Sequence, residues 1–217
     1  LVLEDGQVQG VCLATGEVLS ASAVIITSGT FLSGVMHCGE ETVEGGRLGD
    51  NSSSTLATSL LGAGLRLARL KTGTVPRLDA RSIDWERLSV QEDTVPEGRF
   101  SFAPPRPKLP QIACHVAYTN EAVHEIIRSN VHRSPMYTGA ITGAGPRYCP
   151  SIEDKVVRFA DRERHLLFLE PEGLQTDRVY VNGMSTSLPK DVQEAMLHAV
   201  EGLENAVILQ YGYAVEY

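Results

Sequence analysis

The sequence predicts an α/β fold, and three observations support this prediction. Short strand-like segments separated by turns begin the chain, and residues 24–26 form a continuous apolar run typical of a strand buried in a parallel sheet. A glycine-rich loop then leads into a helical pattern. Strands and helices alternate again in the last third, so we expect one domain that is interrupted by a middle block and then resumes.

Composition limits the classes of protein to which this chain can belong. Hydrophobic residues make up 42% of the 217 positions and charged residues 21%, which is enough for a core and argues against disorder. The net charge of −8 argues against a generic nucleic-acid coat but leaves a local basic patch open. Apolar runs fall far short of the roughly 20 residues that span a bilayer, so we expect no membrane partner. Scattered cysteines without a C-x-x-C pair favour a reduced, cytoplasmic setting and no metal site.

The first third predicts strands at residues 8–13, 17–20 and 23–27, the last of which ends in Ser28-Gly29-Thr30. A glycine just beyond a strand lets a ligand approach the backbone, although a plain turn is the alternative. Residues 45–50 form a glycine-rich loop before a helix at 53–63, for which Ser and Thr side chains are the expected N-caps, and such a helix start can hold a phosphate. The glycines match neither G-x-G-x-x-G nor the Walker pattern, so their spacing alone does not decide whether this loop binds a phosphate.

A change of direction at residues 71–77, after an expected strand at 65–70, marks a domain boundary. The middle block is predicted to be a small α+β insertion with an acidic loop, a proline-rich stretch, a strand at 112–118 and a helix at 120–130. The last third predicts a helix that begins after a Ser151 cap, strands at 166–169 and 179–181, a helix at 189–202 and a strand at 207–209.

Cys149 is the candidate nucleophile. It lies two residues before the Ser151 cap, with Arg147 and Lys155 nearby in the sequence. Positive charge and a helix N-terminus lower the pKa of a thiol, and the thiolate is the nucleophile. An inert buried cysteine is the alternative.

Charged residues suggest further contacts. Two clusters of basic residues can either bind RNA phosphates or form a solvent-exposed face. Glu170 and Glu172 can share one face of an extended segment or cap a turn. The basic groups are Arg66, Arg69, Lys71, Arg77 and Arg81, and Arg128, His132 and Arg133.

The longest recognisable motif is Gly145-Pro146-Arg147-Tyr148-Cys149-Pro150-Ser151-Ile152-Glu153-Asp154-Lys155, which resembles the signature of the MnmG (GidA) family. The resemblance covers essentially the entire chain, through residues 45–50, 69–74, 133–137, 168–173 and 202–206. It implies a central fragment of a flavoprotein, with a Rossmann-like FAD-binding domain at 1–74 and 147–217 interrupted by a small α+β insertion domain at 75–146. The G-x-G-x-x-G fingerprint and a helical region would lie outside this chain.

The family resemblance also implies a function. It implies an enzyme that uses FAD, NADH and, through the GTPase partner MnmE, methylene-tetrahydrofolate to add a carboxymethylaminomethyl or aminomethyl group at C5 of the tRNA wobble uridine. The full-length protein would be a cytoplasmic homodimer, and the isolated fragment would be inactive. Cys149 matches the family's essential cysteine, and residues 145–159 match a segment assigned to the nicotinamide nucleotide. The implied cofactor-binding residues are Gly29, Thr30, Ser53, Gly145, Arg147, Tyr148 and Lys155.

Departures from the family pattern are small. Asn51-Ser52 stands where the family often has two prolines, and Val75 where it often has one, which changes loop stiffness more than chemistry. Two alternatives remain open. One is a folate- and FAD-dependent tRNA uridine C5-methyltransferase, which the Cys149 motif disfavours, and the other is a noncatalytic module that binds RNA or a partner.

Overall fold

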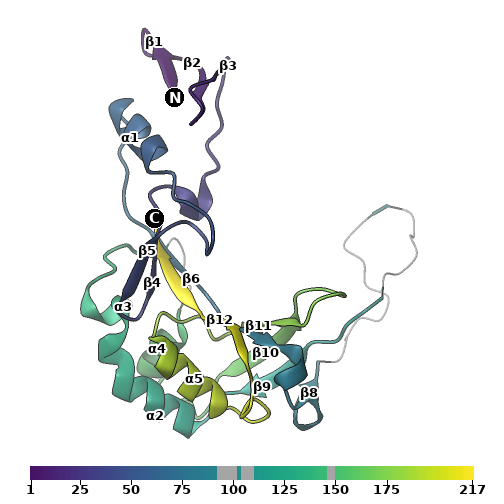
Figure 1. Ribbon diagram of the computed structural model, residues 1–217. Helices are drawn as coiled ribbons and strands as arrows, with labels where there is room; N and C mark the ends of the chain where they lie inside the picture. Colours follow the sequence, from purple (N-terminus) through teal and green to yellow (C-terminus); the bar gives the residue numbers. More distant parts are fainter. Residues whose placement is uncertain (92–101, 104–109, 146–149) are drawn as a thin grey trace.

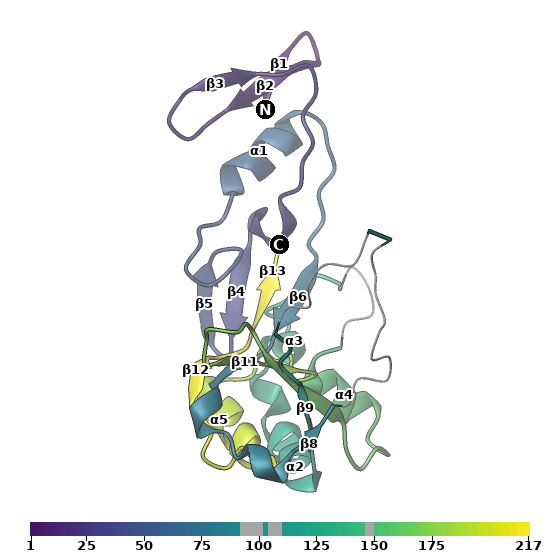
Figure 2. The same cartoon turned by 90° about the vertical axis from the view of Figure 1, so that its right-hand side faces the viewer.

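The fold is that of a computed structural model, which describes residues 1–91, 102–103, 110–145 and 150–217. The molecule is elongated (Figure 1). A small sheet and α1 (Ser54–Gly62) form one end, a four-stranded sheet lies in the middle, and a six-stranded sheet with several helices forms the other end (Figure 2). The structure confirms the predicted mixture of helices and sheets.

The small sheet is an antiparallel meander of β1 (Val2–Glu4), β2 (Gln7–Cys12) and β3 (Val18–Ser20). It confirms the strands predicted at 8–13 and 17–20. The strand predicted at 23–27 is wrong, because this segment has no strand structure and Ile25 is 87% exposed. An apolar run forms a buried strand only where neighbouring strands satisfy its backbone, and no described strand pairs with it.

The four-stranded sheet has the order β5-β4-β13-β6. The last strand of the chain is an inner strand of this sheet, with Ala214 opposite both His37 and Gly73. The side chains of Met36, Tyr213 and Val215 form its small core. The strands are β4 (Val35–Cys38), β5 (Glu41–Glu44), β6 (Lys71–Thr74) and β13 (Tyr213–Glu216).

The six-stranded sheet has the order β12-β7-β11-β10-β9-β8. Every strand pair in it is antiparallel, and so is every pair in the other two sheets. The expected parallel sheet is therefore wrong for the described residues, where the one parallel pairing is an isolated bridge between Leu70 and Ala144. The strands are β7 (Arg77–Asp79), β8 (Ser89–Val90), β9 (His115–Tyr118), β10 (Leu166–Pro171), β11 (Arg178–Asn182) and β12 (Ile208–Gln210).

Helices pack against one face of this sheet and enclose the main core. Alternate strand residues such as Leu167, Leu169 and Val179 are fully buried against Val123 of α2 and Met196 of α5. The helices confirm those predicted near 120–130, after Ser151 and near 189–202. They are α2 (Glu121–Asn130), α3 (Pro135–Thr138), α4 (Ile152–Arg158) and α5 (Lys190–His198).

The six-stranded sheet takes strands from both the predicted insertion and the predicted second part of the FAD domain. The strand expected at 65–70 is wrong, since the strand begins at Lys71. The division at 74/75 and 146/147 remains a prediction about the domains of the whole protein. Within the part of the chain that the structure describes, none of the helices has the length and apolar character needed to traverse a bilayer.

Candidate functional site

The glycine-rich loop folds back onto the turn at Gly29 and Thr30. The Thr30 hydroxyl donates to the carbonyl of Gly46 at 2.6 Å. A Cβ atom on Gly46 would lie 2.6 Å from ring atoms of Phe31, so the close approach requires glycine at this position. Gly29 has φ +53° and open space around its Cβ position, which leaves its backbone accessible from outside.

Ser53 precedes α1 and meets the same turn. Its backbone N–H donates to the carbonyl of Phe31 at 2.7 Å. The Ser53 side chain caps no backbone group of α1, which corrects the expectation of a side-chain cap here. The fold thus brings Ser53 to the turn at Gly29, Thr30 and Phe31, although Ser53 comes much later in the sequence.

The signature motif ends in a well-formed helix start. The Ser151 hydroxyl accepts from the backbone N–H of Asp154 at 3.2 Å, and the Asp154 carboxylate accepts from the backbone N–H of Ser151 at 3.2 Å. This reciprocal capping box confirms the predicted cap. Arg147, Tyr148 and Cys149 lie outside the described residues.

The two flanks of the motif are tied to different parts of the fold. Before Gly145, the carbonyl of Ala144 accepts from the backbone N–H of Lys71 at 2.9 Å. In the last part of the motif, the Ile152 N–H donates to the carbonyl of Ser185 at 2.7 Å, and the Lys155 ammonium donates to the carbonyl of Gly183 at 3.0 Å. Gly145 and Lys155 therefore lie on anchored segments, one at each end of the signature.

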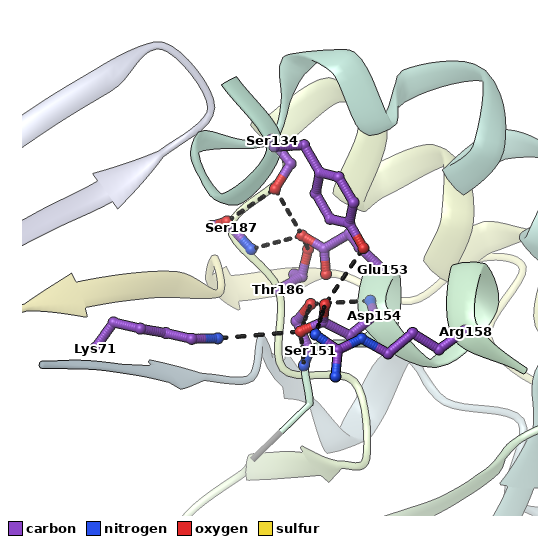
Figure 3. Close-up of polar contacts among 9 residues, drawn as sticks. Lys71, Ser134, Ser151, Glu153, Asp154, Arg158, Thr186 and Ser187 are labelled. Atoms are coloured by element: carbon purple, nitrogen blue, oxygen red, sulfur yellow. Dashed lines mark hydrogen bonds and ion pairs between the residues drawn. The ribbon is translucent and has the colours of Figure 1, made fainter. Parts of the chain in front are cut away.

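A buried carboxyl group anchors the first turn of α4 (Figure 3). Glu153 is fully buried, and its Oε1 accepts from the Ser134 hydroxyl at 3.3 Å and the Thr186 hydroxyl at 3.1 Å. It also accepts from the backbone N–H of Ser187 at 3.1 Å. Its Oε2 has no partner among the described residues. Burial raises the pKa of Glu153 above its usual value.

Asp154, the next residue, faces cations and a phenol. Its carboxylate lies 4.0 Å from the Lys71 ammonium and 3.7 Å from the Arg158 guanidinium. The Tyr137 hydroxyl donates to it at 3.3 Å. Burial and the Asp154 charge raise the pKa of Tyr137 to about 12. The sequence reasoning missed the roles of Glu153 and Asp154, although the Ser-x-x-Asp spacing signals the capping box.

The basic residues are mostly paired within the fold. Arg69 donates to the backbone carbonyls of Ser33 and Glu216, at 2.8 and 3.0 Å, and pairs with the Glu216 carboxylate. Arg66 is exposed. These contacts favour a structural role for most members of both groups over contact with RNA phosphates. The other pairs are Lys71 with Asp154, Arg77 with Glu172, Arg81 with Asp79 and Asp177, Arg128 with Glu121 and Glu125, and Arg133 with Glu40 and Asp191.

Comparisons with known proteins match the chain along its whole length. A family model described as "Glucose inhibited division protein A" matches residues 1–217. The tRNA uridine 5-carboxymethylaminomethyl modification enzyme MnmG of Granulibacter bethesdensis is 57% identical over 210 residues, which cover 97% of this chain and 33% of that protein. The protein of the same name from Rhodopirellula baltica is 54% identical over 215 residues, covering 99% and 33%.

A solved structure agrees with these matches. The form I crystal structure of Aquifex aeolicus GidA superposes with a TM-score of 0.90 at 46% identity, covering 100% of this chain and 37% of that one. The chain spans about a third of the length of the relatives it matches. The resemblance inferred from the signature motif is thus confirmed, and the chain belongs to the glucose inhibited division protein A (GidA) family.

Proposed function

We propose that this chain is the central part of a flavoenzyme that adds a carboxymethylaminomethyl or aminomethyl group at C5 of the tRNA wobble uridine. The observation that carries the proposal is the match along residues 1–217 to a family whose similar members are named for this modification. We assign residues 1–74 and 147–217 to a Rossmann-like FAD-binding domain and residues 75–146 to its insertion. The same family resemblance supports a cytoplasmic homodimer that works with the GTPase MnmE.

The described residues suit one part of an FAD site. The backbone at Gly29 is open to a ligand, and the Ser53 side chain is not used as a helix cap. The first backbone N–H groups of α1 receive no side-chain cap either, and uncapped N–H groups at a helix start favour an anion such as a phosphate. Gly29, Thr30 and Ser53 would hold part of the cofactor, which when bound supplies hydride-transfer chemistry. Gly145, Arg147, Tyr148 and Lys155 are assigned to the nicotinamide nucleotide of NADH.

Cys149 is assigned to the reacting uracil ring. Uracil C5 is a poor nucleophile, and a thiolate that adds to C6 makes C5 enolate-like, so a cysteine suits such a site. Cys149 acts either as this nucleophile or as a proton donor. The contribution of the described residues is to anchor the chain at Gly145, before Cys149, and at Ser151, after it. Methylene-tetrahydrofolate would supply the carbon through the GTPase partner.

The test is a Cys149→Ser variant of the full-length protein. The substitution changes little volume, so flavin content and melting temperature should persist while modified wobble uridine is lost. Modified uridine is measured by mass spectrometry of tRNA, beside the flavin spectrum. Cys114→Ser is the matched control, because Cys114 lies in a different segment, next to β9.

Two results would contradict the proposal. Near-normal modification by the Cys149→Ser variant would remove Cys149 from the mechanism. A simple methyl group at C5, formed by the unsubstituted protein, would favour the methyltransferase alternative instead.

A further inference from the structure

A cleft of about 380 Å³ lies where the glycine-rich loop meets the edges of the two larger sheets. Its volume falls within the range of small-molecule sites. One wall is apolar and includes Phe31, Leu48 and Val215. Another part of the lining is cationic and includes Arg77 of β7 and Arg178 of β11.

The two arginines are held in place before any ligand arrives. Glu172 accepts from the Arg77 Nε–H at 2.9 Å with one oxygen and from the Arg178 Nε–H at 3.0 Å with the other. The Arg77 guanidinium also lies 4.6 Å from the centre of the Tyr180 ring and donates to the carbonyl of Val75 at 2.7 Å. Such fixed side chains lose little entropy when a ligand binds.

Each of the two guanidinium groups has N–H bonds that can still donate to a ligand. Within residues 1–91, 102–103, 110–145 and 150–217, Arg77 Nη2 and Arg178 Nη1 have no hydrogen-bond acceptor. Two positive charges share the single negative charge of Glu172, so this wall keeps a net charge of +1. Guanidinium groups with free N–H pairs are well suited to phosphate oxygens.

The apolar wall suits a flat ring. Phe31 and Tyr213 contribute aromatic side chains, and the Tyr213 hydroxyl is fixed by accepting from the backbone N–H of Leu48 at 3.0 Å. Gln210 also lines the cleft, and its side-chain carbonyl accepts from Arg178 Nη2 at 2.9 Å. The amide N–H₂ of Gln210 is then available to a carbonyl on a heterocycle.

We propose that this cleft binds a nucleotide, with its ring against Phe31 and Tyr213 and its phosphate on Arg77 and Arg178. The inference rests on the proposed function and deepens it, because it assigns nucleotide-binding residues outside the signature motif. A nicotinamide dinucleotide and a tRNA nucleotide share this chemistry.

The test compares uridine monophosphate (UMP) with uridine, by calorimetric titration of the full-length protein. UMP should bind more tightly than uridine, and Arg178→Gln should weaken UMP binding about tenfold without changing uridine binding, because one charge-assisted contact is lost. Arg81→Gln is the matched control, since Arg81 is exposed and pairs with Asp79 outside the cleft. A melting curve checks that each variant is folded, and Arg178→Lys should restore part of the affinity.

Equal affinity for UMP and uridine, or an Arg178→Gln variant with unchanged UMP affinity, would overturn the inference. Titrations with NADH and with an anticodon stem-loop RNA identify which molecule carries the nucleotide, because only the natural ligand should bind more weakly to the Arg178→Gln variant. If both bind equally well to the variant and to the unsubstituted protein, the inference is wrong. The proposed function is tested separately. It is wrong if the unsubstituted protein forms no modified wobble uridine in tRNA, whether or not UMP binds to the cleft.

Discussion

Replacing Glu153 with leucine should destabilise the chain. The substitution removes the acceptor shared by Ser134, Thr186 and the backbone N–H of Ser187. The hydroxyls of Ser134 and Ser187 can still bond to each other, at 3.2 Å, so two donors lose their acceptor. Each buried donor without an acceptor costs about 1–3 kcal/mol. Leucine also buries apolar surface and removes the unpartnered Oε2, so we expect a net loss of about 3 kcal/mol in the free energy of unfolding.

Glu153→Gln is the control that preserves shape and keeps one acceptor oxygen. It should cost about 1 kcal/mol or less at low pH, because glutamine resembles the protonated acid. The pKa of Glu153 is raised in the folded state, so the folded chain binds this proton more tightly than the unfolded chain. The stabilising effect of the proton is complete below the unfolded pKa of about 4.3 and is lost as pH rises toward the folded value. Glutamine carries no such proton.

Urea unfolding of the 217-residue chain, followed at several pH values from about 4 to about 8, measures both effects. The leucine variant should unfold at a lower urea concentration throughout. The stability advantage of the unsubstituted chain over the glutamine variant should shrink as pH rises. A leucine variant as stable as the unsubstituted chain would refute the hydrogen-bond reasoning, and parallel pH profiles for glutamic acid and glutamine would refute the titration reasoning.

The isolated chain should fold but hold little FAD, because its sequence contains no G-x-G-x-x-G; a stoichiometric flavin spectrum in the purified chain would contradict this. Arg69→Glu should lower the free energy of unfolding by about 2 kcal/mol, because it places a second carboxylate beside Glu216, whereas Arg66→Glu at an exposed position should be nearly neutral in the same urea assay. Cys12 should react with iodoacetamide before Cys38, because Cys12 is exposed and burial raises the pKa of Cys38 to about 11; equal labelling by mass spectrometry would rule this out.

Local signals in the sequence predicted the helices well. The Asn120 side chain accepts from the backbone N–H of Val123 at 3.0 Å, and Ser151 caps α4, as their residue types and positions indicate. Both caps depend on residues three apart, so the information lies within one short window. The failure at residues 23–27 has the opposite cause, since a strand needs partners that its own composition does not supply.

Long-range pairings account for the other gaps. No local pattern predicts β13, because its neighbours β4 and β6 lie far earlier in the chain. The role of Arg69 stayed open for the same reason, because nothing near it in the sequence indicates that Glu216 is its partner. Gly29 and Ser53 were predicted as separate ligand contacts. The hydrogen bond from Ser53 to Phe31, which brings them together, depends on the three-dimensional fold.

The position of β13 has a consequence for synthesis on the ribosome. β4 and β6 do not pair with each other and are joined only through residues 213–216, which are translated long after both. At cellular elongation rates, on the order of ten seconds pass between the synthesis of β4 and β6 and the synthesis of β13. During that interval their backbone edges are open to other chains, so a chaperone that shields exposed strands should bind nascent chains until β13 emerges.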